Sequence, residues 1–145
     1  MRGSGVAFSR WSDAHDPADR ECLLLDAMGL LRLFYAQAAV AFVGGTLVPV
    51  GGHNVLEPAL AGVPVLFGPH TEHTRQTAEL LVVSGCGFRV TDAVQLAAEV
   101  CTVVENPIRA AELSLRTREL ALRLRGATYR TLDWLAPVIT PPHGV

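Results

Sequence analysis

The sequence has no excess of positive charge and no long apolar segment, and both absences narrow its possible functions. Twelve Lys and Arg stand against 14 Asp and Glu, giving a formal net charge of −2. The chain therefore offers no general electrostatic attraction for nucleic acid or anionic membrane. Its apolar runs stop well short of the roughly 20 residues that a membrane span requires. We expect a soluble, cytoplasmic chain with no nucleic-acid partner and no membrane segment of its own.

Cysteine and charged residues are also scarce. Three cysteines, an odd number without CxxC spacing, stand at Cys22, Cys86 and Cys101. This pattern argues against a disulfide framework and predicts buried, reduced thiols. Only 18% of the residues are charged and 50% are apolar, a balance that favours a compact domain over disorder. The length of 145 residues suits a single domain, which we place at 1–145.

What the sequence does contain is an alternation of short apolar runs with longer segments of helical period. Strands are expected at 5–9, 21–26, 40–45, 63–68 and 86–90. Helices are expected at 28–39, 54–62, 74–85, 92–106 with an Asp92 cap, and 106–126 with Pro107 in the first turn, before a last amphipathic segment at 127–139. Because the strands are apolar on both faces, we predict an α/β fold with a Rossmann-like, three-layer parallel sheet.

The stretch GGTLVPVGGHNVLEPALAGVPVLFGPH, from Gly44 to His70, joins two glycine pairs to His53, Asn54 and Glu57. It begins at the end of an expected strand and leads into an expected helix, the position where open parallel sheets bind ligands. Glycines allow a ligand to approach the backbone closely or φ to be positive. A helix that begins at Asn54 would present free N–H groups and the positive end of its dipole to a phosphate.

Two interpretations of Glu57 stay open at this point. Its carboxylate is placed to accept hydrogen bonds from vicinal hydroxyls such as those of a ribose, or it forms a capping box with Asn54. The loop matches neither GxxxxGK[ST] nor a dehydrogenase GxGxxG, which argues against an NTPase and a Rossmann oxidoreductase. His70 and His73 form an HxxH pair without further ligands nearby, so no metal is expected.

The segment FVGGTLVPVGGHNVLEPALAGVPVLFGPHTEHT closely resembles the C-terminal half of the bacterial 3-deoxy-D-manno-octulosonic acid (Kdo) transferases. A segment of the form FVGGSLVPxGGHNPLEPAxxGxPVLFGPHTxNF is a hallmark of that family, and LDAMGLLRLFYAQAAVAFVGG resembles the segment before it. The resemblance implies the C-terminal half of a GT-B glycosyltransferase, in which two Rossmann-like halves face a cleft. It also implies transfer of Kdo from CMP-Kdo to a lipid A precursor during lipopolysaccharide synthesis, without a cofactor, on the cytoplasmic face of the bacterial inner membrane.

The same resemblance identifies residues expected to contact the CMP-Kdo donor. Two segments match the CMP-contacting segments of the family, and a third supplies further loop contacts: Met28, Gly29 and Leu30; Asn54, Val55, Leu56 and Glu57; and Gly51, Gly52 and His53. Glu57 is the expected ribose partner. No catalytic residue is expected in this chain, because the family's general base, acceptor surface and membrane anchor belong to an N-terminal half that is not seen here.

The sequence departs from the family pattern in three places. Leu30 stands where the family has Glu, Val50 stands where a basic residue often precedes GGHN, and Glu72–Thr74 replace an aromatic-Asn-aromatic run. These departures and the missing half keep a second interpretation open: a non-catalytic nucleotide-binding or interaction module derived from such an enzyme. A GT-B enzyme that uses a UDP-sugar is disfavoured, because GGHNxLEP and FGPHT occur together.

Overall fold

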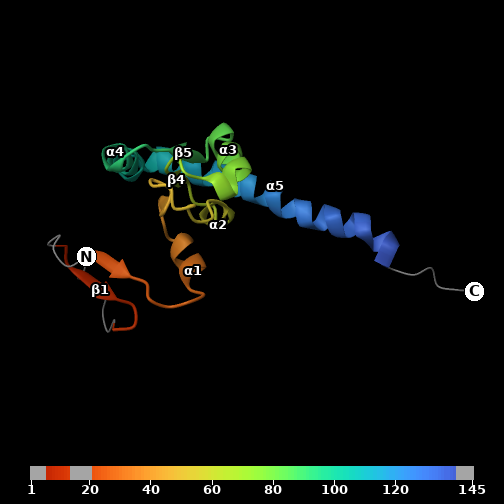
Figure 1. Ribbon diagram of the computed structural model, residues 1–145, viewed down its shortest axis with the longest axis horizontal. Helices are drawn as coiled ribbons and strands as arrows, with labels where there is room; N and C mark the ends of the chain where they lie inside the picture. The colour runs from red at the N-terminus through yellow and green to blue at the C-terminus, as the bar shows by residue number, and fades with distance from the viewer. Residues whose placement is uncertain (1–5, 14–20, 140–145) are drawn as a thin grey trace, which may run out of the picture. The chain divides into compact units, whose positions relative to one another are not determined.

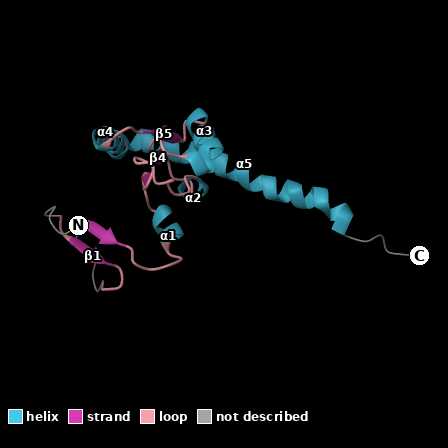
Figure 2. Cartoon of the chain, in the orientation of Figure 1, coloured by secondary structure: helices cyan, strands magenta, loops and turns pink. Residues whose placement is uncertain are grey.

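The structure, a computed structural model, describes residues 6–13 and 21–139, and for 125–130 and 137–139 it describes the backbone alone. Its chain divides into two compact units, Met1–Phe34 and Tyr35–Val145, each of which is described by itself. Figure 1 colours the elements along the chain and Figure 2 colours them by type. In chain order they are β1 (Phe8–Arg10), β2 (Cys22–Leu24), α1 (Leu31–Tyr35), β3 (Ala41–Val43), α2 (Leu56–Leu60), β4 (Val65–Phe67), the 3-10 helix η1 (Glu72–Thr74), α3 (Arg75–Val83), β5 (Gly87–Arg89), α4 (Ala93–Val104) and α5 (Pro107–Ile139).

The first unit contains two short parallel strands. β1 pairs with β2 in a register that sets Phe8 opposite Cys22. Trp11, directly after β1, packs edge to face on Phe34 of α1 with 5.4 Å between the ring centroids, an arrangement that aromatic pairs favour. Both strands were predicted, at 5–9 and 21–26, although residue 5 lies outside the described residues.

The second unit contains a three-stranded parallel sheet in the order β3-β4-β5. α2 connects β3 to β4, and α3 connects β4 to β5, as parallel pairing requires. The central strand β4 pairs Val65 with Ala41 of β3 and Gly87 of β5. All three residues of β4 are fully buried although successive side chains point to opposite faces. The strand is therefore covered on both sides, which confirms the predicted α/β fold with parallel strands.

One hydrophobic core joins this sheet to its helices. Its buried members come from β3, β4, α2, α3, α5 and two connections: Val43, Val55, Ala59, Val65, Phe67, Ala78, Leu81, Cys86 and Leu120. Gly87 of β5 is needed where α3 approaches, because a Cβ there would lie 2.7 Å from the Leu81 Cβ and 2.9 Å from the Phe67 Cε1. Helix α3 therefore packs directly against β5.

Two helices begin at side-chain caps. Asp92 accepts a hydrogen bond from the Gln95 N–H at 2.8 Å, and Asn106 accepts one from the Arg109 N–H at 3.0 Å. Each bond satisfies one of the free donors in the first turn of a helix. The predicted Asp92 cap is confirmed, and Pro107 is the first residue of α5, as its position in the sequence predicted.

Predicted helix bounds were wrong at α1 and α5, and α2 also begins later than predicted. The helix predicted at 28–39 is reduced to α1, and its later start follows from Gly29, which has a φ of +81° and lies outside the right-handed helical region. The segments predicted at 106–126 and 127–139 form one helix, α5. Gly126 costs only about 1 kcal/mol relative to Ala inside a helix, which the helix formers before it offset. Among the described residues, no helix, α5 included, combines the length and apolar character needed to cross a membrane.

The cysteines are free thiols in three different environments. Cys86 is buried in the core, as predicted, and Cys22 is half-buried. Cys101 is exposed on α4, so the prediction of a buried thiol was wrong there. α4 buries Val103 but leaves Cys101 on its solvent-facing side. The apolar pattern of the sequence alone did not show that Cys101 would lie on that side.

Candidate functional site

The connection from β3 to α2 starts at the carboxyl edge of the sheet, and its first part is a glycine loop, residues 44–53. Gly51 and Gly52 have φ values of +97° and +60°, a conformation that other residues rarely adopt. The His53 N–H donates to the Gly44 carbonyl at 3.3 Å, so the two ends of the glycine loop meet. The loop is a closed turn of backbone at the strand end where ligands of parallel sheets bind.

A buried threonine links the glycine loop to the connection that follows β4. The Thr46 hydroxyl donates to the Val43 carbonyl at 2.6 Å and accepts a hydrogen bond from the Gly68 N–H at 2.8 Å. The Thr46 carbonyl accepts a further bond from the His70 N–H at 2.9 Å. Sequence reasoning missed this residue, because a threonine inside a loop carries no signal that it will be buried.

Helix α2 begins later than predicted. Its first residue is Leu56 and its N-cap is Val55, which makes no side-chain cap, while Asn54 accepts the Leu56 N–H at 2.9 Å. A helix of five residues has a small dipole, and one of its N–H groups is already bonded. This helix terminus should therefore attract a phosphate much less strongly than the sequence predicted. Within the described chain, Glu57 forms no capping box with Asn54.

The four predicted residues of this segment differ in burial. Asn54 and Glu57 are exposed, Leu56 is half-buried, and Val55 lies in the core, where it anchors the segment. Burial raises the pKa of Tyr35, and the charge of Glu57 raises it further. The Glu57 carboxylate thus lies within electrostatic range of the Tyr35 phenol, a neighbour that the sequence pattern did not predict because the two lie in different elements.

The segment after β4 brings a histidine against the glycine loop. A Cβ added to Gly51 would lie 3.0 Å from the His73 Nε2, so the imidazole occupies the space beside this glycine. His70 Nδ1 lies 3.4 Å from the Glu72 Oε1. The pKa of Glu72 is lowered, first by its own backbone N–H and then by His70. In the described part of the chain, no three His, Cys, Asp or Glu side chains are grouped to hold a metal ion.

The other predicted segment, Met28–Leu30, belongs to the first unit and is described within it alone. Met28 is 98% exposed and Gly29 has positive φ. Leu30 is half-buried, and its carbonyl accepts the Leu33 N–H at 2.9 Å. The Met28 side chain is thus free to contact a ligand, and the contact of this segment with CMP stays a prediction.

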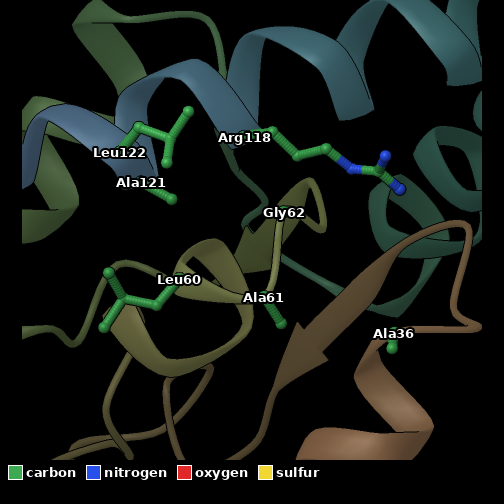
Figure 3. A pocket seen from close by; sticks show the side chains of 7 residues that line it. All are labelled: Ala36, Leu60, Ala61, Gly62, Arg118, Ala121 and Leu122. Atoms are coloured by element: carbon green, nitrogen blue, oxygen red, sulfur yellow. The ribbon is translucent and has the colours of Figure 1, made fainter. Parts of the chain in front are cut away.

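The second unit also has hollows away from the predicted residues. One of about 270 Å³ lies at the carboxyl ends of β4 and β5 and is lined by Pro69, Thr71, Glu72, Arg75, Glu79 and Arg89. Its two arginines are balanced by two glutamates, so it has no net attraction for an anion. Another, of about 320 Å³, lies between α2 and α5 and is shown in Figure 3; it is lined by Ala36, Leu60, Ala61, Gly62, Arg118, Ala121 and Leu122.

Comparison with known proteins gives one consistent result, although no family model matches the chain. The 3-deoxy-D-manno-octulosonic acid transferase of Bordetella pertussis is 34% identical over 137 residues, which are 93% of this chain and 32% of that protein. The transferase of the same name from Chlamydia muridarum (strain MoPn / Nigg) is 44% identical over 91 residues, 62% of this chain and 21% of that protein. The chain thus spans at most about a third of the length of these curated relatives.

A solved structure resembles most of this chain. The crystal structure of the C-terminal CMP-Kdo binding domain of WaaA from Acinetobacter baumannii matches with a TM-score of 0.72 and 29% identity, over 81% of this chain and 61% of that chain. The parallel strands and their connecting helices therefore form an α/β domain of the kind found in that protein. The chain is a homologue of the 3-deoxy-D-manno-octulosonic acid transferases, and its match in structure is to a C-terminal domain.

Proposed function

We propose that this chain binds CMP-Kdo and is the donor-binding part of a Kdo transferase. The observation that carries the proposal is the match, at 29% identity and a TM-score of 0.72, to a domain described as CMP-Kdo binding. The glycine loop supports it independently, because a backbone loop with consecutive positive-φ glycines at a strand's carboxyl end suits close contact with a ligand.

The glycine loop and the segment after it supply the groups that would hold CMP. We place the phosphate beside Gly51, Gly52 and His53, and the ribose beside the exposed carboxylate of Glu57. Transfer of Kdo breaks the bond between the anomeric carbon and the single phosphate, so negative charge grows on the departing CMP. Backbone N–H groups fixed towards that phosphate stabilise the transition state more than the ground state. Asn54, Val55 and Leu56 complete the contact set that we propose within this unit.

The complete protein, on this proposal, is an inverting GT-B glycosyltransferase. It transfers Kdo to a lipid A precursor at the cytoplasmic face of the bacterial inner membrane, and residues 1–145 form one donor-binding domain of it. We infer that the general base belongs to a part of the protein outside this chain, since a base must reach the acceptor hydroxyl. Incubation of the chain with CMP-Kdo and lipid A precursor should therefore give no product, and product formation would refute this part of the proposal.

Calorimetric titration of the purified chain with CMP tests the binding proposal. We expect saturable binding of CMP and markedly weaker binding of UMP and UDP, because the proposed site is specific for a cytidine nucleotide. Equal affinity for all three nucleotides would contradict the assignment of the donor. Absence of binding by a folded chain would favour the alternative, a non-catalytic interaction module derived from such an enzyme. The sequence evidence for that alternative is the departure from the family pattern at Leu30 and at Val50, which is 72% exposed.

A further inference from the structure

Thr46 makes hydrogen bonds with three backbone groups at the carboxyl edge of the sheet. The residue is 0% exposed. Its hydroxyl both donates and accepts: it donates to the Val43 carbonyl at the end of β3 and accepts from the Gly68 N–H just after β4. Its carbonyl accepts from the His70 N–H. A single residue therefore fixes the start of the glycine loop to residues 68–70.

Two glycines pack so closely against Thr46 that neither has room for a Cβ. A Cβ on Gly68 would overlap the Thr46 carbonyl, and a Cβ on Gly52 would lie 2.8 Å from both the Thr46 Cγ2 and the His70 carbonyl oxygen. The Thr46 methyl group thus lies directly beside Gly52, one of the two consecutive positive-φ glycines. The hydroxyl and the methyl thus act on different segments: the hydroxyl bonds β3 to Gly68, and the methyl packs beside Gly52.

We propose that Thr46 is a positioning residue for the nucleotide site: it sets the place of Gly51–His53 relative to residues 68–70. This inference rests on the proposed function, since it assumes that the glycine loop holds the CMP phosphate. Groups that bind a phosphate must be held to within a fraction of an ångström to be effective. Thr46 is buried and does not touch the ligand, so its effect on binding is exerted through the glycine loop.

The chain offers a matched control. Thr117 of α5 is also 0% exposed, and its hydroxyl donates to the Leu113 carbonyl at 2.7 Å within the same helix. Replacing either threonine by valine removes one buried hydroxyl of the same type. Thr117 lies in α5 and links no loops, so its loss should affect stability without affecting the glycine loop.

The experiment compares Thr46→Val, Thr46→Ser and Thr117→Val in the 145-residue chain by calorimetric titration with CMP. Thr46→Val leaves the Gly68 N–H without a partner, so CMP affinity should fall about tenfold or more. Thr46→Ser keeps the hydroxyl and should bind within about threefold of the parent. Thr117→Val should bind within about twofold of the parent. CMP affinity equal to that of the parent in Thr46→Val, or an equal loss in Thr117→Val, would overturn the proposal.

Amide hydrogen exchange separates this inference from the proposed function, because it needs no ligand. In Thr46→Val, exchange at Gly68 and His70 should accelerate more than the change in global stability explains, and in Thr117→Val it should not. Unaltered exchange at these two amides in Thr46→Val would overturn the positioning role even if CMP binds. Failure of the parent chain to bind CMP would overturn the proposed function and the ligand part of this inference together, while accelerated exchange would still support the link between the loops.

Discussion

At the scale of single residues, Glu57 has the strongest connection to the proposed chemistry. It is exposed, it is free of a capping box, and its charge acts on the neighbouring Tyr35 phenol. On our proposal this carboxylate accepts two hydrogen bonds from a ribose, and among the described residues it makes no hydrogen bond that would have to be broken first. Val55, beside it, is buried in the core and holds the segment in place.

Glu57→Ala should weaken CMP binding by about tenfold, because hydrogen bonds to a charged group are among the stronger ones. Calorimetric titration measures the change. Glu105→Ala is the matched control, since Glu105 is also exposed and lies at the end of α4. An affinity unchanged in Glu57→Ala, or reduced equally in Glu105→Ala, would exclude Glu57 as the ribose partner.

Glu57→Gln should lower the pKa of Tyr35. Burial is the main cause of the raised pKa and persists in the variant, whereas the contribution of the carboxylate charge is removed. The pKa should therefore move part of the way back towards the ordinary value of about 10. The ring ¹³C shift of Tyr35 followed against pH reports it, and Glu105→Gln should leave the titration unchanged. No movement in Glu57→Gln would place the two groups further apart than the structure does.

Gly51→Ala should disturb both stability and CMP binding. Its φ is +97°, and the added Cβ would meet the His73 imidazole at 3.0 Å. We expect a loss of roughly 1–2 kcal/mol in the free energy of unfolding from the backbone term alone. Gly44→Ala is the control within the same loop, because a Cβ there has nothing within 4 Å. Thermal or urea unfolding distinguishes the two, and similar losses in both variants would contradict the loop geometry.

At the scale of secondary-structure elements, the sequence predicted best where an apolar run is bounded by glycine. The expected strands at 40–45, 63–68 and 86–90 contain β3, β4 and β5, and α4 lies within the helix predicted at 92–106. The sequence pattern did not predict whether a single glycine would limit a helix or be accommodated inside it. Gly29, through its positive φ, keeps α1 from beginning before it, whereas Gly126 is accommodated inside α5.

The cap of α4 gives a prediction with a defined pH dependence. The pKa of Asp92 is lowered, chiefly because its carboxylate accepts the Gln95 N–H. A carboxylate with a lowered pKa in the folded state stabilises the protein above its unfolded-state value, about 3.9, and this contribution is lost as the pH falls through the folded-state pKa.

Asp92→Ala should therefore lower the melting temperature most near neutral pH, and the difference from the parent should shrink below about pH 4. Differential scanning calorimetry across this range measures it. Glu99→Ala, in the middle of the same helix, removes a carboxylate without removing a cap and should cost less. A difference between Asp92→Ala and the parent that is independent of pH would show that the charge of the cap does not contribute.

The sequence predicted the location of the site better than it predicted the contacts within it. Glycine pairs before a helix predicted where the loop would lie, because glycine has a specific conformational role. Thr46 was missed because its partner Gly68 is 22 residues away in the chain, and the contact exists only once β3 and β4 are paired. The shortness of α2 was missed as well, and with it the weakness of its dipole.

At the scale of the whole molecule, we propose that the nucleotide binds at the connection from β3 to α2. The chain is homologous to the Kdo transferases and spans about a third or less of two of them, so donor binding is the part of their function that we assign to it. This connection belongs to the second unit and is distinct from the hollow between α2 and α5 in Figure 3.

Titration of the ¹⁵N-labelled chain with CMP, followed in ¹H–¹⁵N correlation spectra, tests this claim most directly. We predict that the largest shift changes fall on the amides of Gly51, Gly52, His53 and Glu57, and that those of Ala121 and Leu122 stay in place. Shift changes confined to Ala121 and Leu122, or a saturating titration that leaves residues 51–57 unaltered, would contradict it.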